Sequence, residues 1–90
     1  MSAFSYHFER EVRAVPLWLV REYLLKLGGQ EVGEGVFRGA GWEVQVRDMP
    51  PARVGELIIH RLWLSVKAQD QDTFDELYSR LELMLWRGGG

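Results

Sequence analysis

Cysteine is absent from this chain of 90 residues, as are several other features that would mark a function. Without cysteine the chain has no disulfides, thiolate metal sites or cysteine nucleophiles, which favours an intracellular protein. No apolar run approaches the roughly 20 residues that cross a bilayer, and the first residues lack the basic and apolar regions of a signal peptide. We therefore expect a cytoplasmic protein with no membrane partner.

An excess of charge of one sign is also missing. The chain has 13 acidic and 11 basic residues, which are interspersed, and a formal net charge of -2. A nucleic-acid backbone needs a concentrated positive surface. On two of the strands expected below, the outward residues Glu9, Glu11 and Glu43 outnumber Arg13 and Arg47. We therefore predict that nucleic acid is not a partner.

The residues that are present are sufficient for one folded core. The chain is 47% hydrophobic and contains four Trp, three Tyr and four Phe, which bury much area per residue. Its length is too short for a second core. We predict a single domain over residues 1–87, followed by a flexible glycine tail at 88–90.

Hydrophobic periodicity predicts the order strand, helix, several strands, helix. Residues 4–14 alternate with period two, as in a half-buried strand. A helix is predicted over residues 16–27, because Pro16 suits a first helical position and a Gly-Gly pair follows the last apolar residue of the stripe. Asp70 precedes a second amphipathic helix that is expected to end near Arg87.

The strands between the helices are less clearly delimited. Residues 30–38 predict one irregular strand, because Gly33 and Gly35 weaken it. A glycine turn then leads into an alternating strand that is expected to end at residues 48–51. Residues 54–67 exceed the common strand length and predict either two strands or one with a bend. An α+β fold, with an antiparallel sheet and both helices on one face, buries both helical stripes.

Apolar residues exceed what one core face needs. On the long extended run, the parity opposite to the predicted core contains Leu57, Ile59, Arg61 and Trp63, and Trp18 and Trp86 fall off the main stripes of the two helices. Contiguous exposed aromatic surface marks a partner site. The alternative is a bulge near His60 that swaps the faces and buries Trp63. On the first interpretation, we expect an interaction surface for a protein partner or for a second copy that contains Ile59, Arg61, Trp63 and Trp86.

The two histidines do not predict a catalytic or metal site. His60 shares the parity of the apolar residues, which predicts a hydrogen-bonded residue in the core or at a bend, and His7 lies on the wet face beside Glu9. A metal or general-base role needs a further convergent ligand, which the spacing does not supply. We therefore expect no catalytic residue, no metal, no cofactor and no enzymatic activity.

The C-terminal Gly88, Gly89 and Gly90 allow two interpretations. Sulfur carriers and ubiquitin-like modifiers need a tail without side chains, because an activating enzyme must thread it to its adenylation site. Such a tail usually follows a strand, whereas this one follows a predicted helix. The alternative is an ordinary helix C-cap and a frayed terminus.

Several stretches together carry a resemblance to a known family. They are Phe8-Glu9-Arg10, Pro16-Leu17-Trp18-Leu19, Arg21-Glu22-Tyr23-Leu24, Gly28-Gly29, Glu31-Val32-Gly33-Glu34-Gly35-Val36, Pro51, Val54-Gly55, Leu57 and Arg87-Gly88-Gly89-Gly90. Over Phe8 to Gly90 the chain resembles the C-terminal domain of bacterial MoaD-related proteins. The resemblance implies the fold of one half of the TATA-binding protein, which is strand, helix, four strands, helix. The chain accommodates that fold if residues 54–67 form two strands.

The function that the resemblance implies is an accessory one. In the bacterial proteins a ubiquitin-like domain, similar to the small subunit of molybdopterin synthase, precedes a domain of unassigned function. This chain lacks that ubiquitin-like part, so its carrier role is not implied, and no catalytic residues are carried over. We expect a non-catalytic interaction module linked to molybdenum-cofactor or sulfur-carrier proteins. The alternative is a carrier or modifier that acts through its own C-terminal glycines.

Overall fold

The computed structural model describes residues 4–89, with side chains as far as residue 84. The order of elements is strand, helix, four strands, helix, which is the order that the resemblance implies, although residues 54–67 do not form the two strands expected there. The elements are β1 (Tyr6–Arg13), α1 (Leu17–Lys26), β2 (Gln30–Gly33), β3 (Val36–Gly39), β4 (Trp42–Val54), β5 (Leu57–Ala68) and α2 (Gln71–Gly89).

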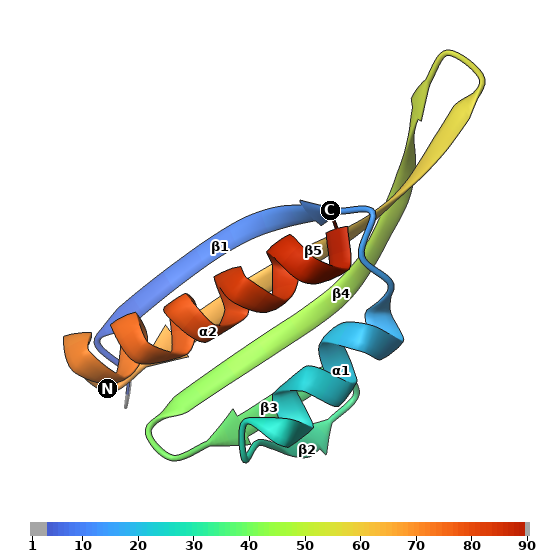
Figure 1. Cartoon of the computed structure of the whole chain (residues 1–90). Helices are drawn as coiled ribbons and strands as arrows, with labels where there is room; N and C mark the ends of the chain where they lie inside the picture. Colours follow the sequence, from blue (N-terminus) through green and yellow to red (C-terminus); the bar gives the residue numbers. More distant parts are fainter. Residues whose placement is uncertain (1–3, 90) are drawn as a thin grey trace.

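The strands form one antiparallel sheet, and both helices cover the same face of it (Figure 1). The strand order is β1-β5-β4-β3-β2, so β1 and β2 lie at the two borders. The predicted α+β class and the placement of the helices are therefore confirmed. The opposite face of the sheet carries no helix, and we call it the open face.

The core lies between the sheet and the helices. Every second side chain of the long strands points to the helices, because successive side chains of a strand alternate between faces. The helices contribute the apolar stripes that their periodicity predicts. The buried side chains are Val12, Val15, Val20, Leu24, Phe37, Trp42, Val44, Val46, Leu62, Leu64, Val66, Ala68, Leu77, Leu81 and Met84.

Local signals place both helices close to their predicted ends. Pro16 precedes α1 with an extended backbone, and Gly28 follows it with φ 94°, a conformation that glycine adopts at little cost. At the start of α2 the Asp70 carboxylate accepts a hydrogen bond from the Thr73 amide at 2.8 Å. This contact satisfies one of the free amides of the first turn.

The prediction for residues 30–38 was wrong. They form two strands, β2 and β3, because Gly35 takes φ 71° in the tight turn between them. Gly33 and Gly35 therefore mark a turn and not a weak strand. The fourth strand of the fold arises here, whereas Leu57 to Ala68 is the single strand β5.

The prediction that residues 48–51 end a strand was also wrong, because β4 continues to Val54. Met49 lies opposite Arg61 and Ala52 lies opposite Ile59, so two prolines of β4 share the space of one residue of β5. This is a β-bulge, which suits proline because proline has no amide proton to pair. The bulge lies in β4 and leaves the alternation of β5 intact.

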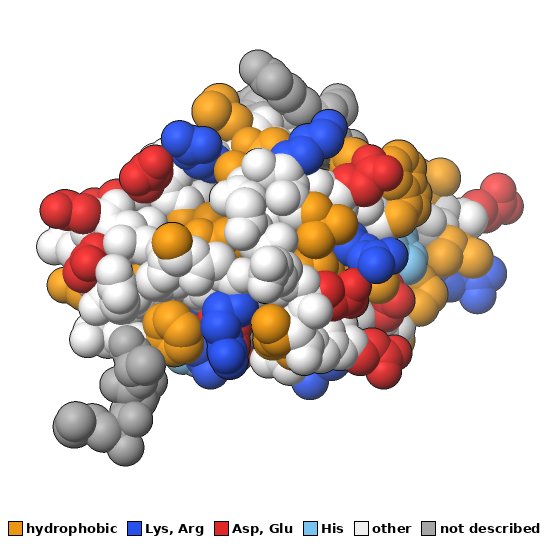
Figure 2. Space-filling view, turned by 90° about the horizontal axis from the view of Figure 1, so that it is seen from below, with side chains coloured by type: hydrophobic (Ala, Val, Ile, Leu, Met, Phe, Trp, Pro, Cys, Tyr) orange, Lys and Arg blue, Asp and Glu red, His pale blue; other side chains and the backbone are white. Residues whose placement is uncertain are grey.

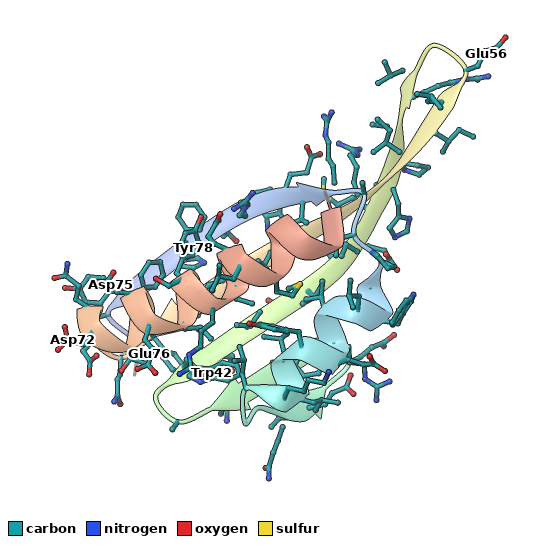
Figure 3. The ribbon with its side chains drawn as sticks, viewed as in Figure 1. Trp42, Glu56, Asp72, Asp75, Glu76 and Tyr78 are labelled. Atoms are coloured by element: carbon teal, nitrogen blue, oxygen red, sulfur yellow. The ribbon has the colours of Figure 1, made fainter. Side chains whose placement is uncertain are left out.

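Beyond the sheet, β4 and β5 continue as a two-stranded arm. Pairing of β4 with β3 reaches Gln45, and pairing of β5 with β1 ends at Arg61. Residues 49–60, which we call the arm, therefore extend past both neighbouring strands (Figure 1). Glu56 lies at its tip, far from both helices (Figure 3).

Candidate functional site

The open face carries three of the four residues predicted as an interaction surface. Ile59, Arg61 and Trp63 occupy alternate positions of β5 and point to the same side, because the strand has no bulge of its own. The alternative in which a bulge near His60 swaps the faces is thus wrong. All three side chains are half-buried. Trp86 is on α2, which covers the other face, and its side chain lies outside the described residues.

Arg61 fixes the base of the arm. Its guanidinium donates a hydrogen bond to Glu11 on β1 at 2.6 Å and another to the carbonyl oxygen of Pro50 in the bulge at 2.7 Å. Glu11 also accepts a hydrogen bond from Arg13 at 2.9 Å. These two arginines lower the pKa of the Glu11 carboxyl, with Arg13 the larger cause. Arg61 therefore joins β1, β5 and the bulge of β4.

A polar group of residues lies beside Trp63 on the open face. The ring of His7 lies 3.0 Å from the buried hydroxyl of Ser65, and Glu9 accepts a hydrogen bond from the Trp63 indole at 3.4 Å. Residues Glu9, Gln45, Arg47, Trp63 and Ser65 line a hollow of about 70 Å³. Sequence reasoning gave His7 no partner, because its contact with Ser65 depends on the pairing of β1 with β5.

The contact between His7 and Ser65 does not have the geometry of a nucleophilic triad. In such a triad the carboxylate binds the imidazole nitrogen that does not face the hydroxyl. Here Glu9 lies 3.7 Å from Nε2 of His7, which is the nitrogen that faces Ser65. His60 is exposed and pairs with Asp48 at 3.1 Å, opposite the bulge. Within residues 4–89 no cluster of three His, Asp or Glu side chains could hold a metal ion.

The arm adds three exposed apolar side chains, of which the sequence pattern had singled out Leu57 alone. Val54, Leu57 and Ile58, which we call the arm patch, are 55%, 67% and 71% exposed. Hydrophobic side chains gather at the end of the molecule that carries the arm, beside charges of both signs (Figure 2). Val54 and Leu57 lie opposite each other across the hairpin. Sequence spacing missed Val54 and Ile58, because their exposure depends on how far the helices extend over the sheet, and neither helix reaches the arm.

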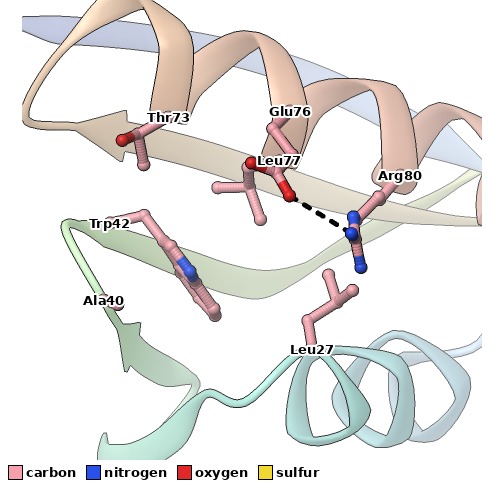
Figure 4. Close-up of a pocket in the computed structure, with 7 residues that line it drawn as sticks. All are labelled: Leu27, Ala40, Trp42, Thr73, Glu76, Leu77 and Arg80. Atoms are coloured by element: carbon pink, nitrogen blue, oxygen red, sulfur yellow. Dashed lines mark hydrogen bonds and ion pairs between the residues drawn. The ribbon is translucent and has the colours of Figure 1, made fainter.

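A second cavity lies between the helices and is smaller and more open to charged, exposed side chains than a typical ligand site (Figure 4). Its volume is about 240 Å³, below the 300 Å³ or more of common ligand pockets. Glu76 and Arg80 pair at 3.1 Å on its rim, and both side chains are exposed. The lining residues are Leu27, Ala40, Trp42, Thr73, Glu76, Leu77 and Arg80.

The carrier interpretation concerns the end of α2. This helix includes Gly88 and Gly89, whereas Gly90 lies outside the described residues. The predicted flexible tail at 88–90 stays a prediction. None of the described helices is long and apolar enough to cross a membrane.

Comparison with known proteins assigns the chain to a family. No curated protein matches the sequence. The family model described as Archaeal MoaD-like protein matches residues 8–90. The resemblance to MoaD-related proteins is thus confirmed, with an archaeal family in place of the bacterial one. The match covers almost the whole chain, and the protein belongs to the family of archaeal MoaD-like proteins.

Proposed function

We propose that this protein is a non-catalytic interaction module that binds a sulfur-carrier protein of the kind used in molybdenum-cofactor biosynthesis. Membership of the MoaD-like family supports the link to such proteins. The observation that carries the proposal is the arm, whose apolar side chains are exposed on an extended hairpin. Apolar surface held away from the core favours contact with another protein.

The docking surface in this proposal has two parts. The arm patch supplies Leu57 and Ile58, each of which contributes about 1.5–3 kcal/mol when a partner buries it fully. The half-buried Trp63 supplies an aromatic anchor on the open face of the same strand. The contacts of Arg61 with Glu11 and Pro50 keep the two parts in a fixed relation, which lowers the entropy lost on binding.

The proposed partner is a ubiquitin-like sulfur carrier. In the bacterial proteins that this sequence resembles, such a domain is joined covalently to the matching domain. Contact between such a carrier and the matching domain needs an exposed surface on that domain, which the arm supplies. The surface has mixed charge, with Arg53 and Glu56 at the end of the arm, so apolar contacts supply most of the affinity.

The test is a calorimetric titration of this protein with a purified ubiquitin-like sulfur carrier from the same organism. We expect Leu57→Ser and Trp63→Ala each to weaken binding about tenfold or more, because each removes an anchor at the centre of the surface. Leu25→Ser and Trp18→Ala are matched controls, since both remove exposed side chains of α1. Equal affinities for all four variants, with circular dichroism showing intact folds, would refute the proposal.

The second candidate function is a carrier that acts through Gly88, Gly89 and Gly90. The family match supports it because it includes these glycines. Use of the tail requires the last turn of α2 to unwind, which is cheap because glycine costs about 1 kcal/mol in a helix. Intact-mass spectrometry of protein from its native cells tests it: a sulfur-for-oxygen shift supports the carrier, and an unmodified mass under carrier-charging conditions contradicts it.

A further inference from the structure

The hollow beside Trp63 lies where β5 carries its shortest outward side chain. Ser65 is opposite Glu9 of β1 and Gln45 of β4 in the two registers. Trp63 precedes it by two residues on the same face, and Arg47 lies opposite Trp63. These longer side chains surround Ser65 and leave a hollow of about 70 Å³. Every residue that lines the hollow belongs to a strand, so the pairing of the sheet fixes its walls.

The floor of the hollow carries a hydrogen-bond donor. Ser65 is 5% exposed and is the one buried polar side chain among the described residues. Its hydroxyl lies 3.0 Å from Nε2 of His7. The Glu9 carboxylate lies 3.7 Å from the same nitrogen, which favours the tautomer that carries its hydrogen there. The hydroxyl then accepts from His7 and keeps its own hydrogen to donate to a ligand.

Arg47 supplies the positive charge of the hollow. Its side chain is exposed, and within the described part of the chain it forms no ion pair. Acids of the same face already have donors: Arg38 pairs with Glu43 at 2.7 Å, and Glu9 accepts from the Trp63 indole at 3.4 Å. Arg47 is thus free to bind a carboxylate, with which arginine forms strong charge-assisted hydrogen bonds.

The size of the hollow favours a ligand that ends without a side chain. A volume of about 70 Å³ is well below the 300 Å³ or more of common ligand pockets, so a small terminal group fits and a larger one does not. The ring of Trp63 adds an apolar wall against which a methylene group packs. The amide of Gln45 can donate to a carboxylate or accept from a peptide N–H. A terminal glycine carboxylate has this size and this chemistry.

We propose that this hollow binds the C-terminal glycine carboxylate of the sulfur carrier, with Arg47 and the Ser65 hydroxyl as its donors. The inference rests on the proposed function and names the part of the carrier that reaches the open face. The hollow shares Trp63 with the proposed docking surface. Ser65 follows Leu57 by eight residues of β5, which span about 26 Å. A carrier on the arm therefore reaches the hollow with an extended tail of about eight residues.

The first part of the test uses a peptide without the carrier domain. Nuclear magnetic resonance follows the Trp63 indole and the Ser65 amide while acetyl-triglycine is added to the isotope-labelled protein. We expect both signals to shift with the free carboxylate and not with the peptide amide. Arg47→Gln should abolish the shifts, whereas Arg38→Gln is the matched control on the same face, because Glu43 already pairs with Arg38. Equal shifts with acid and amide, or with a peptide that ends in leucine, would overturn the inference.

The second part measures calorimetric binding of the intact carrier. Deletion of the carrier's last two glycines should weaken binding to the unmodified protein about tenfold, because charge-assisted hydrogen bonds are lost, and should hardly change binding to Arg47→Gln. Glu9→Gln should tighten binding of the intact tail, since it removes a like charge beside the carboxylate. A carrier that binds equally with and without its glycines would overturn this inference and leave the proposed function standing. A carrier that does not bind at all would overturn both.

Discussion

Leu57 and Leu64 show how differently two leucines of one strand are placed. Leu57 is 67% exposed on the arm, whereas Leu64 is 2% exposed under the helices. We expect Leu64→Ala to lower the free energy of unfolding by about 2–5 kcal/mol, because it leaves a cavity. Leu57→Ala is expected to change it by about 0.5 kcal/mol or less. Urea unfolding measures both, and equal losses would show that Leu57 belongs to the core.

Glu11 makes the stability of the fold depend on pH. Hydrogen bonds from Arg13 and then Arg61 hold the pKa of its carboxyl below the usual 4.5. A carboxyl with a lowered folded pKa stabilises the fold above the unfolded value, and this contribution is lost as the pH falls through the folded value. Glu11→Gln should therefore lower the melting temperature at neutral pH, with the gap closing below about pH 4. A gap that is constant with pH would contradict this role.

Two glycine turns of the hairpins differ in how much they depend on glycine. Gly35 has φ 71° and a side chain there would collide with the carbonyl oxygen of Val46, whereas Gly55 has φ 62° and faces open space. We expect Gly55→Ala to cost about 1 kcal/mol for its left-handed backbone, and Gly35→Ala to cost clearly more. Thermal unfolding of the two variants compares them, and a smaller loss at Gly35 would contradict the tight turn.

The helices could be predicted from the sequence because their signals are local. Pro16, the Gly28-Gly29 pair and Asp70 act within a few residues of the helix ends. The strands depended on partners far along the chain. β4 continues past Pro50 because β5 pairs with it on both sides of the bulge. The sequence of residues 48–51 alone does not predict that pairing.

The candidate surface could likewise be predicted only where local rules decide it. The shared face of Ile59, Arg61 and Trp63 follows from period two, which is a local rule. The exposure of Ile58 does not, because its parity is that of the core and it is exposed since neither helix extends over the arm. The contact of His7 with Ser65 likewise depends on the register of two strands.

At the scale of the molecule, the arm gives the protein an elongated shape, with extents of 44 × 26 × 20 Å. The exposed side chains of Val54, Leu57 and Ile58 lie on this arm. A partner can therefore bury them without contact with α1 or α2.

The central claim is that the arm and the open face of β5 bind a sulfur-carrier protein. Its most direct test is a nuclear magnetic resonance titration of the isotope-labelled protein with the unlabelled ubiquitin-like sulfur carrier. The account predicts that amide shifts concentrate at residues 54–63, and that α1 is unaffected. Shifts confined to the helices, or no shifts when the carrier is in excess, would contradict it.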